Sequence, residues 1–94
     1  MIKVYVNKTE IKITGHANFD DCGKDIVCAS VSSIVYTTIN AILNFDNKAL
    51  SIEDNKDLII TINSDDKITK KLIDNMLMPL EDLQKQYPEN LKIM

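Results

Sequence analysis

A long helical pattern in residues 25–44 constrains the fold more than any other feature of this chain. Apolar residues recur there at steps of three and four, and small polar residues occupy the opposite side. The apolar set is Val27, Val31, Ile34, Val35, Ile39 and Ile42, and the polar set is Ser30, Ser33, Thr37, Asn40 and Asn44. This separation predicts an amphipathic helix with Asp25 as its N-cap. Because β-branched residues are weak helix formers, packing against another layer must hold the helix in place.

Two strands are predicted before this helix. Residues 2–6 and 10–14 each alternate between apolar side chains and polar or amphipathic ones, as strands with one buried face do. The residues between them, Asn7-Lys8-Thr9, suit a tight turn. We therefore expect an N-terminal hairpin.

A second pair of strands is predicted after the helix, at residues 49–53 and 57–63, around a turn at residues 54–56. Residues 58–62 are nearly continuous in apolar side chains, which is typical of a strand covered on both faces. We therefore place this strand centrally in the sheet.

A second helix is predicted toward the end of the chain. Its apolar residues at helical spacing are Ile68, Leu72, Met76, Leu80, Leu83 and Tyr87. Ser64 or Asp65 is the expected N-cap. Pro79 is expected to kink or split the helix and Pro88 to end it, because proline lacks a backbone N–H. Residues 91–94 predict a short last strand.

The resulting order of elements is β-β-α-β-β-α-β. A chain of 94 residues has the size of one domain, so residues 1–94 are expected to fold as a single unit. The expected fold class is α+β, with two helices packed on a small mixed or antiparallel sheet.

Charge and hydropathy narrow the classes of partner. The formal net charge is -3 and the basic residues are scattered, which disfavours direct binding of nucleic acid. The first residues do not resemble a signal peptide, and no run is long enough to span a membrane, so no membrane partner is expected. The expected compartment is the cytoplasm, where the two cysteines favour free thiols over a disulfide.

Cys28 is the candidate nucleophile. With Asp25 as the N-cap, Cys28 is the third helical residue, near free backbone N–H groups and the positive end of the helix dipole, which favour a thiolate. The alternative is a small core residue, because Cys28 lies at the edge of the apolar arc and free cysteines are often buried. The Asp25 carboxylate opposes thiolate formation, so it helps only if it caps the helix or holds His16.

His16 is the only histidine of the chain and the candidate proton carrier. The alternative is a polar loop residue that faces water. Gly15 before it permits an unusual backbone angle or a close approach of chains. Ser32, one helical turn after Cys28, is a candidate for orienting substrate or thiolate, or else it bonds a backbone carbonyl within the helix.

Cys22 is best interpreted as a tolerated small loop residue. A zinc site built from His16, Cys22 and Cys28 lacks a fourth protein ligand and a standard spacing, so no metal is expected. A redox pair of Cys22 and Cys28 lacks the Cys-x-x-Cys arrangement.

These residues also carry a resemblance to a known family. Gly15-His16-Ala17, followed by a loop and by Gly-Lys-Asp-Ile-Val-Cys-Ala-Ser-Val-Ser at residues 23–32, resembles the ribosomal-processing cysteine proteases, the Prp family. The resemblance covers essentially the whole chain, including Tyr87-Pro88 before a short strand. Members are small bacterial enzymes that remove an N-terminal extension from a large-subunit ribosomal protein.

The resemblance implies roles by position. Cys28 matches the nucleophile, His16 the catalytic histidine, Asp25 and Ser32 the aspartate and serine around the site, and Gly15 and Gly23 the loop glycines. It implies no cofactor and a homodimer. The implied substrate is a peptide with aromatic or apolar residues before the cut, a small residue after it and then a basic segment.

The resulting hypothesis is a cysteine endopeptidase that acts on a ribosomal protein during ribosome assembly. Its main rival is a non-enzymatic, ribosome-associated binding module in which Cys28 is structural. The reactivity of the Cys28 thiol distinguishes the two readings.

Overall fold

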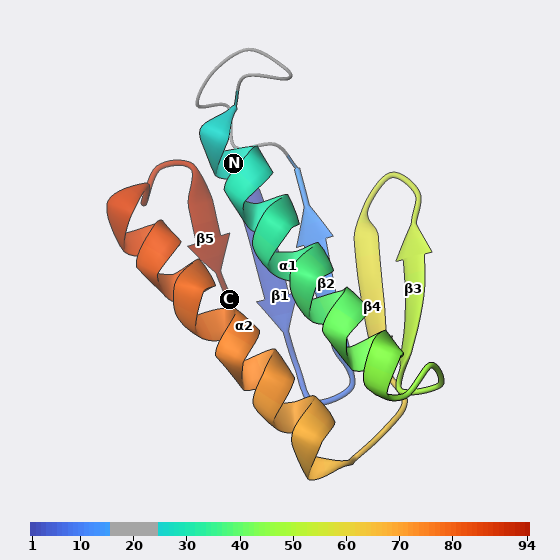
Figure 1. Cartoon of the computed structure of the whole chain (residues 1–94). Coiled ribbons are helices and arrows are strands. Elements are labelled where there is room, and N and C mark those ends of the chain that lie inside the picture. Colours follow the sequence, from blue (N-terminus) through green and yellow to red (C-terminus); the bar gives the residue numbers. More distant parts are fainter. Residues whose placement is uncertain (16–24) are drawn as a thin grey trace.

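The computed structural model of the protein describes residues 1–15 and 25–94. The described elements follow the predicted order (Figure 1): β1 (Ile2–Val6), β2 (Glu10–Thr14), α1 (Ile26–Phe45), β3 (Leu50–Asp54), β4 (Leu58–Ile62), α2 (Lys67–Gln86) and β5 (Leu91–Ile93). The predicted α+β class is therefore confirmed.

The five strands form one mixed sheet in the order β3-β4-β2-β1-β5. All neighbouring pairs are antiparallel except β1 and β5, which are parallel. The strand β4 has a neighbour on each side, as its apolar run predicted, although the middle strand is β2. The edges of the sheet are β3 and β5.

The predicted hairpin joins β1 and β2, and Asn7 forms its turn. The side-chain oxygen of Asn7 accepts hydrogen bonds from the backbone N–H groups of Thr9 at 2.9 Å and Glu10 at 2.8 Å. An asparagine that bonds the backbone two or three residues on is a common turn former. This contact sets the register in which Val6 faces Ile11.

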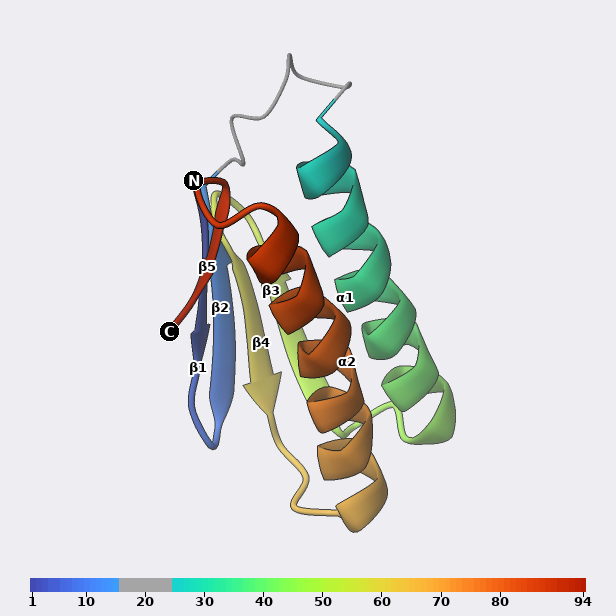
Figure 2. The same ribbon diagram turned by 90° about the vertical axis from the view of Figure 1, so that its left-hand side faces the viewer.

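Both helices cover one face of the sheet, as Figure 2 shows. The core lies between the two layers and takes alternate residues from each strand, including Ile2, Val4, Ile11, Leu50, Ile60 and Leu91. From α1 it takes Val27, Val31, Val35, Ile39 and Ile42, and Ile34 packs against it half-buried. The apolar stripe predicted for this helix is therefore confirmed.

The helix α2 departs from its prediction at its start. Its N-cap is Asp66, whose carboxylate accepts the N–H of Ile68 at 2.8 Å, so the expected cap at Ser64 or Asp65 is wrong. Ser64 instead accepts the N–H of Asp66 at 3.1 Å and supports the turn before the helix.

The buried face of α2 is also shifted from the predicted one. It consists of Thr69, Ile73, Met76 and Leu80, whereas Ile68 is 46% exposed. The first turn of the helix therefore presents Thr69 to the rest of the protein. The predicted stripe is correct from Leu72 onward, because Met76 and Leu80 lie in the core and Leu72, Leu83 and Tyr87 pack against it half-buried.

Pro79 lies inside α2, which continues unbroken from Lys67 to Gln86, so the expected split does not occur. The position of Pro79 is exposed, and the carbonyl that loses its helical partner belongs to Asn75, which is exposed too. Water can satisfy that carbonyl. The helix ends at Gln86, with Tyr87 as its C-cap, directly before Pro88, as predicted.

By length and composition alone, α1 qualifies as a membrane-spanning helix, because it has 20 residues and an 18-residue window with a mean hydropathy of 1.8. The expectation that no segment has this property is therefore not met. The core helix of a soluble protein passes the same test, and five residues of α1 lie in the core. A single helix of this kind is therefore weak evidence for a membrane segment.

Candidate active site

The start of α1 is built by Asp25. One carboxylate oxygen of Asp25 accepts hydrogen bonds from the backbone N–H groups of Val27 and Cys28, both at 3.0 Å. Its own carbonyl accepts the N–H of Ala29 at 3.0 Å. Asp25 is only 8% exposed. It is therefore the predicted N-cap, held in a nearly closed environment.

Cys28 lies in the first turn of α1, third in the helix, as predicted. It is half-buried and packs against the edge of the hydrophobic core. Its side chain packs against apolar core residues, and its backbone N–H donates to the Asp25 carboxylate. It is neither buried in the core nor fully in water, which suits a nucleophile that must remain reachable.

Gly15 directly follows the strand β2 and has a φ of +82°, a conformation that other residues rarely adopt. A Cβ atom at this position would collide with the backbone carbonyl oxygen of Met1. The close approach of chains expected for Gly15 is therefore present, and it is made with the residue that precedes β1.

Ser32 is exposed on α1, one turn beyond Cys28. The bond from a serine hydroxyl to a backbone carbonyl of the same helix is instead made by Ser30, which donates to Ile26 at 2.7 Å. Ser32 lies on the wall of a cavity that Gly15 also borders. The structure thus brings Ser32 and Gly15 to one place.

This cavity of about 320 Å³ separates α1 from the end of β2 and from the β3–β4 turn. Its apolar wall and its polar rim are formed by Ile13, Gly15, Val31, Ser32, Val35, Tyr36, Asp54, Lys56 and Leu58. Polar and apolar groups line it in about equal measure, and a concave site that combines the two can hold and orient a small group. It lies directly beyond Cys28 along α1.

A hydrogen bond crosses one end of this cavity. The hydroxyl of Tyr36 on α1 donates to the carboxylate of Asp54 at the end of β3. The bond to Asp54 raises the pKa of Tyr36 above its usual value, with further contributions from partial burial and from the Asp54 charge. Sequence reasoning missed this pair. The available signal was the position of Tyr36 two steps of four residues after Cys28, which places it about 12 Å further along the helix and about 80° round it.

His16, Cys22 and Gly23 lie outside the described residues, so their predicted roles remain predictions. Within residues 1–15 and 25–94, no group of three or more His, Cys, Asp or Glu side chains is placed to hold a metal ion. Among the predicted site residues that the structure describes, Asp25 and Cys28 are in direct contact, through the hydrogen bond from the Cys28 N–H to the Asp25 carboxylate.

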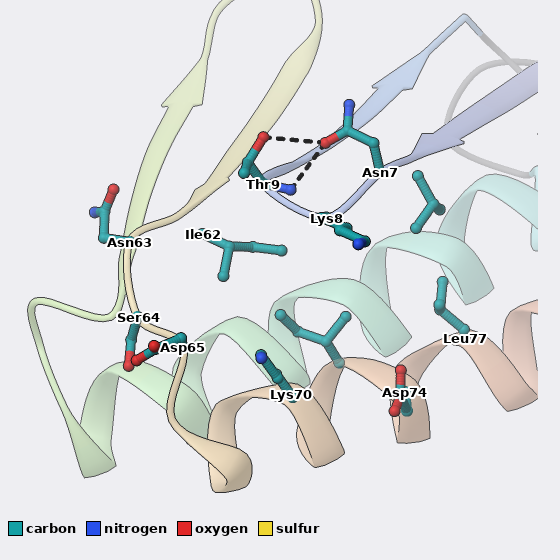
Figure 3. Close-up of a pocket in the computed structure, with 12 residues that line it drawn as sticks. Asn7, Lys8, Thr9, Ile62, Asn63, Ser64, Asp65, Lys70, Asp74 and Leu77 are labelled. Atoms are coloured by element: carbon teal, nitrogen blue, oxygen red, sulfur yellow. Dashed lines mark hydrogen bonds between the residues drawn. The ribbon is translucent and has the colours of Figure 1, made fainter.

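A larger cavity of about 790 Å³ lies at the other end of the molecule, between the β1–β2 turn, the end of β4 and the first half of α2 (Figure 3). Lys8 and Lys70 line it, together with Asp65, Asp74 and an apolar base that includes Ile62. In the β1–β2 turn beside it, the side-chain oxygen of Asn7 already accepts hydrogen bonds from the backbone N–H and the hydroxyl of Thr9. It is separate from the start of α1 and contributes nothing to the candidate site.

The fold and the cysteine at the start of α1 define a candidate thiol-dependent enzyme. The family described as Cysteine protease Prp matches residues 1–92. The chain belongs to this family and is therefore a cysteine protease.

Curated relatives match over most of their length. The ribosomal processing cysteine protease Prp of Bacillus subtilis is 29% identical over 91 residues, covering 87% of this chain and 80% of the relative. The Prp protein of Mycoplasma pneumoniae is 30% identical over 92 residues, covering 95% and 89%.

Solved structures share the fold. The Staphylococcus aureus ribosomal processing protease Prp with a covalently linked product peptide superposes with a TM-score of 0.85 and 24% identity, covering 98% of this chain and 94% of that one. The same protease with a substrate peptide gives 0.80 and 23%, covering 99% and 95%. At this identity the likeness establishes the α+β fold with its mixed sheet.

Proposed function

We propose that this protein is an endopeptidase that removes the N-terminal extension of a large-subunit ribosomal protein during ribosome assembly. Relatives that match most of the chain are named ribosomal processing cysteine proteases. The observation that carries the proposal is Cys28 in the first turn of a helix capped by Asp25, one helical turn before a cavity that Ser32 lines. In this proposal the enzyme is a homodimer, as its resemblance to the family suggests, and it works in the cytoplasm.

The proposed chemistry is acyl transfer. The Cys28 thiolate attacks the scissile carbonyl carbon, and the C–N bond breaks to leave a thioester on Cys28 and a free amine. His16 accepts the thiol proton and donates it to the leaving amine. Water then attacks the thioester, which releases the second product and restores the thiol.

The hydrogen bonds at the helix start limit which groups can hold the oxyanion. The N–H groups of Val27 and Cys28 already donate to Asp25, and that of Ala29 donates to the Asp25 carbonyl. Among the first four described residues of the helix, Ile26 is the one whose N–H group takes part in none of these hydrogen bonds. We therefore assign the Ile26 N–H as the oxyanion donor from α1, with any other donor coming from outside the helix.

The test is incubation of the protein with the precursor of the ribosomal protein from the same genome, with the products read by mass. The wild type is expected to release one N-terminal peptide. Cys28→Ala is expected to abolish the release and to leave the fold intact, and His16→Ala to slow it by about 10²- to 10⁴-fold. Cys22→Ser is the matched control and is expected to cleave normally.

Cleavage by Cys28→Ala at the wild-type rate contradicts the assignment of the nucleophile. Loss of cleavage in Cys22→Ser points instead to a redox pair. Light scattering of the purified protein tests the homodimer, and a mass of one chain contradicts it.

The packing of Cys28 against the core favours one rival function, a binding module with a structural cysteine. The module predicts that the wild type binds the precursor without cutting it and that its thiol reacts slowly with alkylating agents at every pH. The protease predicts fast alkylation of Cys28. Alkylation rates with Cys22→Ser, which leaves one thiol, separate the two functions.

A further inference from the structure

Cys28, Ser32 and Tyr36 follow one another at steps of four residues along α1. Side chains four residues apart lie on the same side of a helix, and each step advances about 6 Å along its axis. Tyr36 is therefore about 12 Å from Cys28 along the helix, with Ser32 halfway. The cavity beside α1 is lined by Ser32 and Tyr36 but not by Cys28, so it begins one helical turn beyond Cys28 and follows α1 from there.

The size and lining of the cavity select its occupant. Its volume of about 320 Å³ is at the lower end of the range for small-ligand cavities, roughly 300 to 1,000 Å³. It therefore suits one side chain better than a folded segment. Val31, Val35 and Leu58 give it an apolar wall, and two charged residues of opposite sign, Asp54 and Lys56, stand on its rim. Asp54 disfavours acidic side chains there, and Lys56 disfavours basic ones.

The Tyr36–Asp54 hydrogen bond links α1 to the end of β3 on the wall of this cavity. Because the Asp54 carboxylate accepts from Tyr36, it is already engaged and offers less to an ammonium group of a peptide. A tyrosine hydroxyl is protonated at neutral pH even at its ordinary pKa of about 10, and the bond to Asp54 raises the pKa of Tyr36 further. The hydroxyl can therefore donate to Asp54 at neutral pH.

We propose that this cavity receives one uncharged side chain of the peptide substrate, and that the Tyr36–Asp54 pair closes its far end and sets the largest side chain accepted. This specificity role rests on the proposed function. An extended peptide advances about 3.3 Å per residue, and the cavity lies about 6 to 12 Å from Cys28 along α1. The side chain in the cavity therefore belongs to the residue two or three positions from the scissile bond.

The experiment compares peptides of the precursor cleavage region in which each of three positions on either side of the cut is changed to Ala, Leu, Phe, Trp or Lys. The ratio of kcat/KM values between side chains is measured for the wild type, Tyr36→Ala, Tyr36→Phe and Asp54→Asn. Thr37→Ala is the matched control, because Thr37 is an exposed neighbour on α1 that does not line the cavity. Thermal unfolding checks that each variant is folded.

Tyr36→Ala is expected to raise kcat/KM for Trp relative to Ala by about tenfold or more at one position, two or three residues from the cut. Tyr36→Phe keeps the ring and frees the Asp54 carboxylate, so cleavage of the Lys peptide is expected to rise severalfold at that same position. Asp54→Asn is expected to leave the Lys peptide as poor as it is for the wild type. Thr37→Ala is expected to keep the wild-type profile.

The proposal is overturned if the wild type cleaves but Tyr36→Ala and Tyr36→Phe keep its side-chain preferences at every position. It is also overturned if the changes occur only at the residues joined by the scissile bond. In both cases the proposed protease function stands. If the wild type cleaves none of the peptides or the precursor, the protease function and the specificity role fail together. If Tyr36→Ala does not fold, the proposal is tested by Tyr36→Phe alone. An unchanged kcat/KM for the Lys peptides then overturns it.

Discussion

The carboxylate of Asp25 lies 3.0 Å from the backbone nitrogen of Cys28 and accepts its hydrogen bond. The residue that begins α1 is thereby tied directly to the candidate nucleophile. One side chain caps the helix and fixes the backbone on which the sulfur is carried. Changes at Asp25 should therefore affect both the stability of the protein and the placement of Cys28.

Asp25→Ala is expected to lower the free energy of unfolding by about 1 kcal/mol, because the helix loses its cap. For a domain of this size that corresponds to a fall in Tm of roughly 4 to 8 °C. Asp25→Asn keeps an acceptor oxygen and is expected to lose much less. Urea unfolding measures both, and Asp66→Ala, which removes the cap of α2, is the control that leaves the start of α1 unchanged. Equal losses for Asp25→Ala and Asp25→Asn would contradict a capping role.

Gly15→Ala is expected to destabilise the protein by more than about 2 kcal/mol. A left-handed backbone alone costs an ordinary residue roughly 1 to 2 kcal/mol, and the added Cβ also collides with the carbonyl oxygen of Met1. Gly15→Asn separates the two causes, since asparagine tolerates a positive φ better than alanine. We expect Gly15→Asn to be nearly as unstable, measured by thermal unfolding. Recovery of wild-type stability in Gly15→Asn would show that the contact with Met1 is unimportant.

Thr69→Val is expected to stabilise the protein by about 1 kcal/mol. The hydroxyl of Thr69 is buried and has no hydrogen-bond partner in the described part of the chain, and a buried unpaired hydroxyl is unfavourable by roughly 1 to 3 kcal/mol. Valine has nearly the same shape and a similar helix propensity. Thr69→Ser keeps the hydroxyl, loses a methyl group and is expected to be less stable than the wild type. A lower urea midpoint for Thr69→Val would mean that the hydroxyl is paired in solution.

Tyr36 is expected to ionise above its usual pKa of about 10, because the bond to Asp54 favours the protonated phenol. The difference in phenolate absorbance between the wild type and Tyr36→Phe during an alkaline titration isolates this group. Asp54→Asn is expected to move the transition to lower pH. Since the folded pKa exceeds the unfolded one, the stability that this pair contributes is complete below pH 10 and is lost as the pH rises through the folded value. An unchanged transition in Asp54→Asn excludes the bond.

Much of the local structure follows from the sequence because it depends on residues that are close along the chain. The apolar spacing of α1 and the alternation in β1 and β2 each involve steps of at most four residues. Capping by Asp25 acts over two and three residues, which is why Cys28 could be assigned to the first turn in advance. The N-cap of α2 was predicted wrongly because three adjacent residues, Ser64, Asp65 and Asp66, are all good caps. Local preference alone does not choose among them.

Only the tertiary structure decided which distant surfaces meet. The parallel pairing of β1 with β5, the approach of Met1 to Gly15 and the contact of Tyr36 with Asp54 join residues far apart in the chain. Repeating patterns state that a face is apolar but not which partner covers it. The sequence thus determined the helices, the hairpin and the place of the thiol, because short-range hydrogen bonding and periodicity govern them. The packing of helices on the sheet determined the strand order and the cavity beside Cys28, because these depend on the shapes of surfaces that exist only once the chain has folded.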